Sequence, residues 1–242
     1  PTGPDMDLVE QLVKDPEVKG MWCVPKYSNP DGIIYSDETI RRLAAMKPAA
    51  PDFLLMWDNA YCVHDLYDES DKLLNILDEC RKAGKEDMCY IFASTSKISF
   101  PGAGVAALAT SESNMKVLKN KYAYQTIGYD KLNQFRHVKF YKDVRGIKNH
   151  MRLHRSILAP KFKAVINEFK LQLGGLGVAT WTNPKGGYFI SLDVMEGTAK
   201  RVYMLCRDAG VTLTTVGATF PYGIDPKDQN IRIAPSYPPV DE

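Results

Sequence analysis

Four short polar segments in this sequence carry side chains that could do chemistry. They are Tyr27–Gly32, Asp58–Tyr61, Ser94–Lys97 and Asn230–Pro235. The amine of a lysine is a nucleophile, and the guanidinium of an arginine can clamp a carboxylate through two parallel hydrogen bonds. Taken one at a time, each segment also has an ordinary explanation. Asn-Pro-Asp-Gly favours a turn, an Asp after a strand often caps a helix, and a Lys or Arg is usually solvated.

Three of these segments directly follow short apolar runs that predict strands, over residues 18–24, 53–57 and 88–93. A fourth strand is predicted at 105–109, and helices are predicted over 5–15, from Ser36 to about Met46, and over 69–83. The compact run 53–57 is of the kind buried on both faces of a parallel sheet. Alternating strands and helices indicate a parallel or mixed α/β sheet, whose ligands gather beyond the carboxyl ends of its strands. That is where the three segments fall.

The second half has a different pattern. Helices are predicted over 111–122, 129–140 and about 144–173, with a bend near Pro160. Shorter elements follow, with strands predicted at 178–182, 187–193, 211–215 and 230–234 and a helix at 197–209. These form a small α+β unit. We therefore expect two domains, 1–155 and 156–242, with the boundary inside the long helix.

Composition narrows the classes of function. The net charge of +2 in 242 residues gives no electrostatic case for nucleic acid or for an anionic membrane. No apolar run approaches the roughly 20 residues that span a bilayer. The five cysteines show no CxxC spacing, which favours reduced thiols in a cytoplasmic protein over a zinc site or a disulfide framework. His150 and His154 have a spacing that could suit a metal on a helix, but no third ligand is evident.

Taken together, the four segments resemble the aspartate-aminotransferase-like enzymes of fold type I, which depend on pyridoxal 5'-phosphate (PLP). The order and spacing of Asn29, Asp58, Lys97 and Arg232 match that family, as do the patterns Asp-x-x-Tyr and Ser-x-x-Lys. Ser-Thr-Ser-Lys followed by Gly-Ala-Gly-Val, and Ile-Arg-Ile-Ala-Pro-Ser-Tyr-Pro, are most similar to a divergent, MocR-like branch. The resemblance covers essentially the whole chain, including Gly186–Phe189. It implies that residues 1–155 are the C-terminal part of a PLP-binding large domain, with a mostly parallel sheet and flanking helices, and that 156–242 are the small domain.

The resemblance also implies a role for each residue. Lys97 would hold PLP as a Schiff base and then move a proton, and Asp58 would keep the pyridine nitrogen protonated so that the ring accepts electrons. Asn29 and Tyr61 would hydrogen-bond the phenolic oxygen of the cofactor. Ser94 and Ser96 would donate to its phosphate. Arg232, assisted by Asn29, would bind the α-carboxylate of the substrate in a bidentate pair that a Lys could not reproduce.

The sequence departs from the family pattern in two places. Relatives of the better-known branch have a phosphate-binding Arg where this chain has Val105, and no Lys or Arg lies between Lys97 and Lys116. The expected substitutes are the backbone N–H groups of Gly102–Gly104, the serines, or a part of the protein that precedes this chain. Complete members also extend further at the N-terminal side, where they carry a phosphate loop and a ring that stacks on the cofactor. We therefore expect this chain to be the C-terminal portion of a longer protein.

The implied function is an aminotransferase that moves an amino group from an amino acid, with aspartate as the first candidate, to a 2-oxo acid such as 2-oxoglutarate. The family further implies a homodimer, with no nucleic-acid or membrane partner. Two alternatives stay open. One is an effector domain of a transcription regulator that senses its ligand without turnover, and the other is a PLP lyase or decarboxylase on the same scaffold, which would also use Lys97 and Asp58.

Overall fold

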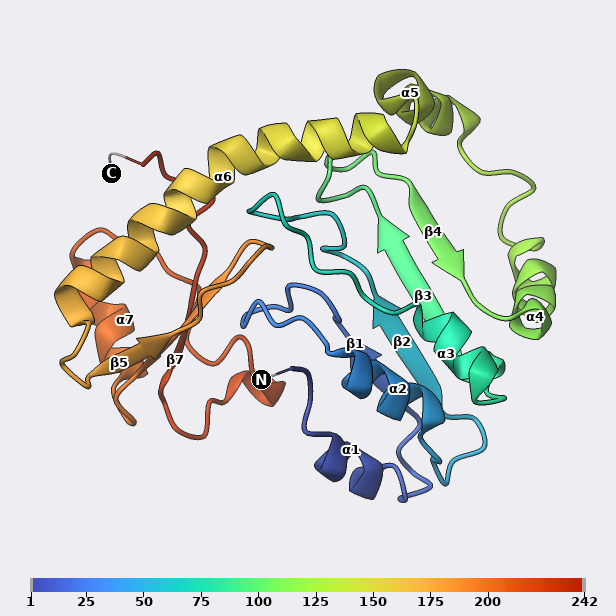
Figure 1. Cartoon of the computed structure of the whole chain (residues 1–242), viewed down its shortest axis with the longest axis horizontal. Coiled ribbons are helices and arrows are strands. Elements are labelled where there is room, and N and C mark those ends of the chain that lie inside the picture. The colour runs from blue at the N-terminus through green and yellow to red at the C-terminus, as the bar shows by residue number, and fades with distance from the viewer. Residues whose placement is uncertain (1, 241–242) are drawn as a thin grey trace. The chain divides into compact units, whose positions relative to one another are not determined.

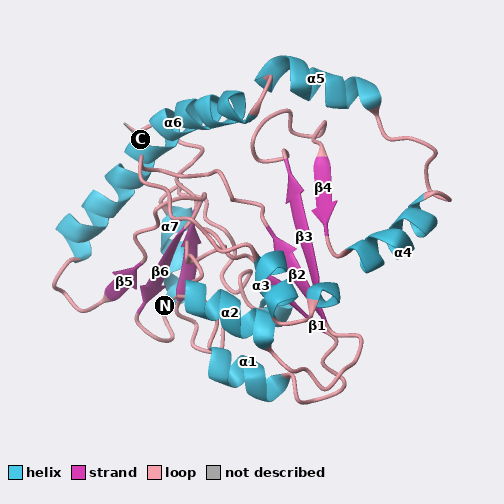
Figure 2. Ribbon diagram, turned by 45° about the vertical axis from the view of Figure 1, so that its right-hand side comes forward, coloured by secondary structure: helices cyan, strands magenta, loops and turns pink. Residues whose placement is uncertain are grey.

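A computed structural model of the chain describes residues 2–240. The chain folds into two compact units. Two short segments from the first half of the chain belong to the second unit. Unit 1 comprises Pro1–Lys26, Ile33–Cys62 and Asp71–His150, and unit 2 comprises Tyr27–Gly32, Val63–Ser70 and Met151–Glu242. Each unit is built around its own sheet (Figures 1 and 2).

The sheet of unit 1 has the order β1-β2-β3-β4, with strands β1 (Gly20–Cys23), β2 (Leu54–Asp58), β3 (Cys89–Ser94) and β4 (Ala106–Ala109). The first three strands are parallel, and β4 runs antiparallel to β3 with Ser94 opposite Ala106. This confirms the predicted α/β class and the mostly parallel sheet. Because β2 and β3 are parallel neighbours, the residues that follow them emerge at the same edge.

Helices α1 (Met6–Leu12), α2 (Asp37–Ala45) and α3 (Ile76–Lys82) pack with this sheet. Leu55 and Trp57 of β2 are buried in one core with Ile40 and Leu43 of α2. The alternate residues Leu54 and Met56 are only half-buried, so among the described residues β2 has one fully buried face instead of the two predicted. The short run of apolar residues could not distinguish these cases, because both faces of β2 carry large side chains.

Side-chain caps set where the helices of unit 1 begin. Asp5, Ser36 and Asn75 accept hydrogen bonds from backbone N–H groups in the first turns of α1, α2 and α3. The helix predicted over 69–83 starts too early. Asn75 caps α3, which therefore begins at Ile76. A 3-10 turn over Glu86–Met88 precedes β3.

The chain then forms α4 (Glu112–Tyr122), α5 (Lys131–Tyr141) and α6 (Val144–Leu173). The predicted 144–173 helix is confirmed at both ends, and Pro160 lies inside it. Within residues 2–240 we find no helix with the length and apolar character needed to cross a membrane.

Unit 2 has an antiparallel sheet of order β5-β6-β7, with strands β5 (Ala179–Trp181), β6 (Ile190–Val194) and β7 (Asn230–Ile233). Helix α7 (Ala199–Asp208) and a 3-10 turn over Pro221–Gly223 lie between β6 and β7. The strand predicted at 211–215 is wrong, because these residues join no ladder. Their apolar character serves packing instead, since Leu213 contacts the core formed by Leu192, Val194 and Ile231.

Candidate active site

Asp58 and Ser94 end the two neighbouring parallel strands β2 and β3. Asp58 lies opposite Phe92 in the β2–β3 register, and the following Asn59 donates its backbone N–H to the Phe92 carbonyl at 2.8 Å. The half-buried Asp58 carboxylate accepts a hydrogen bond from the Ala60 N–H at 3.0 Å. This turn directs the chain across the end of β3.

Lys97 and Tyr61 come together at this edge of the sheet. Tyr61 follows β2 and is 5% exposed, and Lys97 follows β3 with an exposed side chain. The Lys97 Nζ lies 5.2 Å from the centroid of the Tyr61 ring, within the range of a cation–π contact. A primary amine and a carboxylate are thus carried on adjacent strand ends, with an aromatic ring beside the amine.

Two serine hydroxyls precede Lys97 in the same turn. Ser94 donates from Oγ to Ser96 Oγ at 3.1 Å, and the Ser96 N–H points to Ser94 Oγ at 3.4 Å. Gly104 packs closely here, because a Cβ on it would approach Ser96 Oγ to 3.1 Å. The Val105 N–H is bound by Thr95 Oγ1 at 2.9 Å, so this amide is already used inside the loop.

Arg232 and Asn29 come together within unit 2. The Arg232 guanidinium donates to Asn29 Oδ1 at 3.0 Å and to Thr214 Oγ1 at 3.3 Å, and it lies 4.6 Å from the centroid of the Phe189 ring. Its Nε is buried without a hydrogen-bond partner among the described residues. An unsatisfied buried N–H on a cation is costly unless a ligand accepts from it.

The alternation of β7 points Arg232 away from the core of unit 2. Ile231 is 1% exposed and packs in that core, whereas Arg232 lies opposite Ser191 of β6. Asn29 belongs to the segment 27–32, which closes a turn through the Gly32 N–H and the Ser28 carbonyl. Tyr27 anchors this segment by donating from its hydroxyl to Asp65 Oδ1 at 2.5 Å.

The structure therefore groups the candidate residues in two sets. Unit 1 gathers Asp58, Tyr61, Ser94, Ser96 and Lys97 at one edge of its sheet, and unit 2 joins Asn29 to Arg232 by a hydrogen bond. Sequence reasoning missed the contact of Thr214 with Arg232, because residues 211–215 were assigned to a strand. The contact of Phe189 was missed as well, although Gly186–Phe189 had been noted as part of the resemblance.

The buried cysteines take no part in either set. Cys23, Cys80 and Cys89 are fully buried in the core of unit 1. Burial raises the pKa of the Cys23 thiol to about 12, so that it stays protonated near neutral pH. Within residues 2–240 no group of three or more His, Cys, Asp or Glu side chains is placed to hold a metal ion.

Comparison with known proteins gives the family. The model of the family described as aspartate amino-transferase matches residues 1–242. The chain belongs to this family. An aspartate aminotransferase of Corynebacterium glutamicum is 48% identical over 99% of the chain. A protein of Mycolicibacterium smegmatis, whose aminotransferase name is provisional, is 51% identical over 98% of the chain.

Solved structures agree with the family fold. The crystal structure of an aspartate transaminase from Corynebacterium glutamicum matches 99% of the chain with a TM-score of 0.97 and 47% identity, and the match spans 57% of that chain. The α-aminoadipate aminotransferase LysN of Thermus thermophilus shares the fold at 19% identity, with a TM-score of 0.79 over 99% of this chain and 59% of its own. The chain spans 55–56% of the length of its two curated relatives.

Proposed function

We propose that the chain is part of a PLP-dependent aminotransferase, which moves an amino group from an amino acid to a 2-oxo acid. The observation that carries the proposal is the pair of Lys97 and Asp58 on adjacent strand ends, with the Lys97 amine over the Tyr61 ring. Membership of the aspartate aminotransferase family supports it.

The residues present fit the chemistry of PLP. An exposed primary amine, a carboxylate and two hydroxyls gather at one sheet edge of unit 1. These groups match the aldehyde, the pyridine nitrogen and the phosphate of PLP, in that order. When bound, PLP supplies an electrophilic aldehyde and a ring that accepts electrons from an adjacent carbanion.

Lys97 would act first as the nucleophile that attaches the cofactor and then as the base that moves a proton at the substrate's α-carbon. Asp58 would hold the proton on the pyridine nitrogen through a charge-assisted hydrogen bond. Because the Ala60 N–H occupies only Asp58 Oδ1, the carboxylate keeps further acceptor positions for this bond.

The remaining residues of the two sets would bind and orient. Ser94 and Ser96 would donate to the phosphate, and Tyr61 and Asn29 would hydrogen-bond the phenolic oxygen of the cofactor. Arg232 would clamp the α-carboxylate of the substrate. Its guanidinium uses two N–H donors within the described part of the chain, on Asn29 and Thr214, and its Nε–H is unsatisfied there.

Aspartate and 2-oxoglutarate are the substrates we propose first, because the 48% identical relative from Corynebacterium glutamicum is named an aspartate aminotransferase. We also propose that the protein is a homodimer and that it belongs to the MocR-like branch. The branch assignment rests on the Ser-Thr-Ser-Lys and Ile-Arg-Ile-Ala-Pro-Ser-Tyr-Pro wording.

Reduction of the PLP-loaded protein with borohydride tests the proposal. We expect the reduced cofactor on the peptide that contains Lys97, an absorbance change on adding aspartate, and oxaloacetate formation with 2-oxoglutarate. Lys97→Ala should abolish the label, whereas Lys116→Ala, at an exposed position on α4, should leave it unchanged. A label on another lysine, or binding of PLP without any amino-group transfer, would contradict the proposal.

A further inference from the structure

The turn that carries Lys97 is organised around the residue two positions before it, Thr95. The Thr95 N–H donates to the Val105 carbonyl at 2.9 Å, and the Thr95 carbonyl accepts from the N–H groups of Ile98 at 2.9 Å and Ser99 at 3.0 Å. The Thr95 Oγ1 accepts from the Val105 N–H, also at 2.9 Å. Lys97 therefore sits inside a loop whose closure depends on Thr95.

His137 of α5 binds the same hydroxyl. It is 8% exposed, with Nε2 at 3.0 Å from Thr95 Oγ1 and Nδ1 at 2.9 Å from the Asn133 carbonyl oxygen. A carbonyl oxygen only accepts, so Nδ1 carries a proton. In the neutral ring Nε2 is then an acceptor, and the Thr95 hydroxyl donates to it while accepting from Val105. Every donor in this chain of bonds has one acceptor.

Two further side chains, Tyr141 and His150, bind the residues that follow Lys97. Tyr141, one helical turn further along α5, donates from its hydroxyl to Ser99 Oγ. His150 of α6 donates from Nε2 to the Ile98 carbonyl at 3.1 Å. The end of α5 and the start of α6 thus hold the segment that directly follows the lysine, while His137 holds Thr95, two positions before it.

Aromatic rings pack around these hydrogen bonds. Phe100, just beyond the turn, meets the ring of His137 edge-on at 5.3 Å and that of Phe140 at 5.4 Å. Tyr141 and His150 meet edge-on at 5.5 Å. Edge-on contacts of this kind favour the ring orientations on which the hydrogen bonds depend.

Lys97 itself is exposed and has a long, flexible side chain. The backbone position of the lysine therefore decides where its amine can reach. We propose that His137 is a positioning residue for Lys97, acting through the Thr95 hydroxyl. The proposal rests on the proposed role of Lys97 as the cofactor lysine, and it adds a function for a histidine outside both sets of candidate residues.

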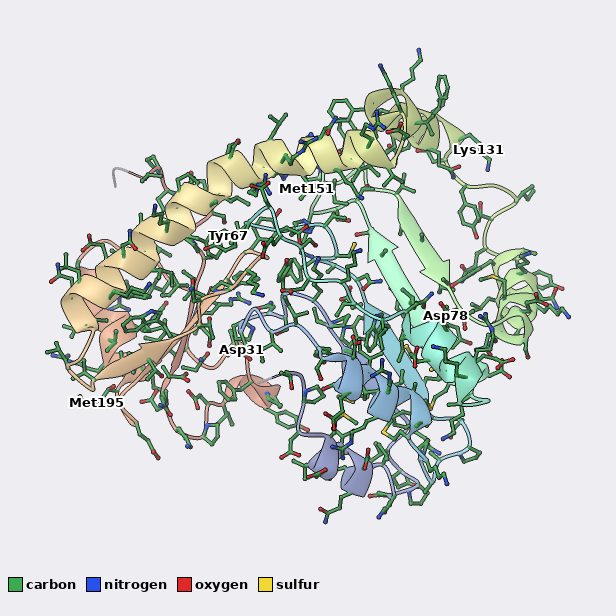
Figure 3. The ribbon with its side chains drawn as sticks, viewed as in Figure 1. Asp31, Tyr67, Asp78, Lys131, Met151 and Met195 are labelled. Atoms are coloured by element: carbon green, nitrogen blue, oxygen red, sulfur yellow. The ribbon has the colours of Figure 1, made fainter. Side chains whose placement is uncertain are left out.

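Two substitutions separate hydrogen bonding from packing. His137→Phe keeps an aromatic ring against Phe100 but removes the acceptor for Thr95. His137→Gln places an amide oxygen near the position of Nε2 and so restores an acceptor. Val138→Ala, at the neighbouring exposed position on α5, is the matched control for general effects on the helix, which begins at Lys131 (Figure 3).

The experiment measures hydrogen–deuterium exchange in the peptide covering residues 94–100 of the cofactor-free protein, together with the rate at which added PLP labels Lys97. For His137→Phe we expect this peptide to exchange about fivefold faster or more, as the loss of one net hydrogen bond allows. Labelling should slow, and kcat should fall by about 10- to 100-fold with little change in KM, because a displaced catalytic group affects the chemical step. His137→Gln should recover most of each effect, and Val138→Ala should show none.

Unchanged exchange of the 94–100 peptide in His137→Phe would overturn the proposal. Faster exchange with an unchanged labelling rate would overturn it too, because the histidine would then stabilise the turn without positioning the amine. Failure of the proposed function looks different, since wild-type protein would then carry no label on Lys97.

Discussion

At the scale of single residues, the chemistry of the site depends on which groups meet at the edge of the first sheet. Asp58 is half-buried and keeps acceptor positions beyond the one that Ala60 occupies. Its carboxylate is therefore placed to act on a ligand as well as on its own turn. The same edge carries Lys97 over the Tyr61 ring, so an acid and an amine are available on neighbouring strands.

Replacing Asp58 with Ala should retain part of the PLP binding but lower kcat by about 100-fold or more, because a fixed charge that stabilises the reacting system is lost. Steady-state kinetics with aspartate and 2-oxoglutarate measure this effect. Asp78→Asn is a suitable control, since Asp78 lies on α3 and forms an exposed pair with Arg81 (Figure 3). Near wild-type turnover in Asp58→Ala would exclude the assigned role.

Arg232→Lys should lower kcat/KM for the amino acid by about 10- to 100-fold. A lysine keeps the charge but loses the planar fork that binds both oxygens of a carboxylate, and it leaves the hydroxyl of Thr214 and the amide of Asn29 without their partner. The comparison is with Arg201→Lys, at an exposed position on α7. An unchanged kcat/KM in Arg232→Lys would argue against a carboxylate clamp.

Some candidate residues carry a signal in the sequence, whereas others depend on tertiary contacts. Lys97 and Asp58 became candidates because each follows a predicted strand and because the order and spacing of the four segments resemble a known family. His137 gave no such signal, because its partner Thr95 lies 42 residues earlier in the chain. Only the packing of α5 against the Lys97 turn brings the two together.

At the scale of elements, the start of β7 depends on one carboxylate. Asp225 accepts from the backbone N–H groups of Lys227 at 3.0 Å, and of Gln229 and Asn230 at 2.7 Å each. Desolvation opposes the ionisation of Asp225, but the hydrogen bonds outweigh it and hold the pKa of this carboxyl below its usual range. The loop thus fixes the strand that carries Arg232.

Asp225→Asn should lower the free energy of unfolding near neutral pH by about 1 kcal/mol. A carboxyl with a lowered pKa in the folded state stabilises the fold above its ordinary pKa of about 3.9, and this contribution disappears as the pH falls through the folded-state value. The difference between wild type and variant should therefore shrink below about pH 4. Urea unfolding at several pH values measures it, and a difference that grows on acidification would contradict the assignment.

The predicted elements were most accurate where the pattern was long. The helix over 144–173 was predicted from its periodicity and was confirmed at both ends. The helix predicted over 69–83 begins only at Ile76, because Asn75 provides the cap although leucines continue the helical spacing upstream. Residues 211–215 were predicted to form a strand, but they join no ladder, and Leu213 packs against the core of unit 2 instead.

The packing of the Tyr27 segment depends on Gly186, because a Cβ at this position would clash with the Tyr27 ring and with the His64 carbonyl. Gly186→Ala should therefore destabilise the protein by about 1–3 kcal/mol. Thermal unfolding checks this, with Gly128→Ala as the control, since a Cβ added there would meet nothing within 4 Å. Equal melting temperatures for the two variants would show that the Tyr27 segment tolerates displacement.

At the scale of the whole molecule, unit 2 recruits two short segments from the first half of the chain, 27–32 and 63–70. The backbone secures the second of them, since the Leu66 N–H donates to the Lys185 carbonyl and the Gly187 N–H donates to the His64 carbonyl, both at 2.9 Å. Asn29 lies in the first segment and so belongs to the same unit as Arg232, although 203 residues separate them. No local sequence pattern carries this information.

Unit 1 also exposes apolar side chains along the segment 124–135, which links α4 to α5 and continues into α5. Tyr124, Ile127 and Leu132 are 94%, 106% and 81% exposed, and Tyr129 and Phe135 are more than half exposed. Apolar side chains exposed to this extent are typical of a surface that another chain or another part of the same protein covers. It is the surface to test for the proposed homodimer.

Leu132→Asp should therefore weaken self-association of the protein that carries this chain by about 30-fold or more, because a carboxylate in the centre of an apolar interface is desolvated without a partner. Sedimentation velocity over a range of concentrations measures the change. Leu171→Asp provides the matched control, since Leu171 is 74% exposed on α6 and lies outside the segment. We expect wild type and Leu171→Asp to sediment as dimers and Leu132→Asp to shift toward a folded monomer. A monomeric wild type, or a Leu132→Asp dimer of unchanged affinity, would contradict an interface at this segment.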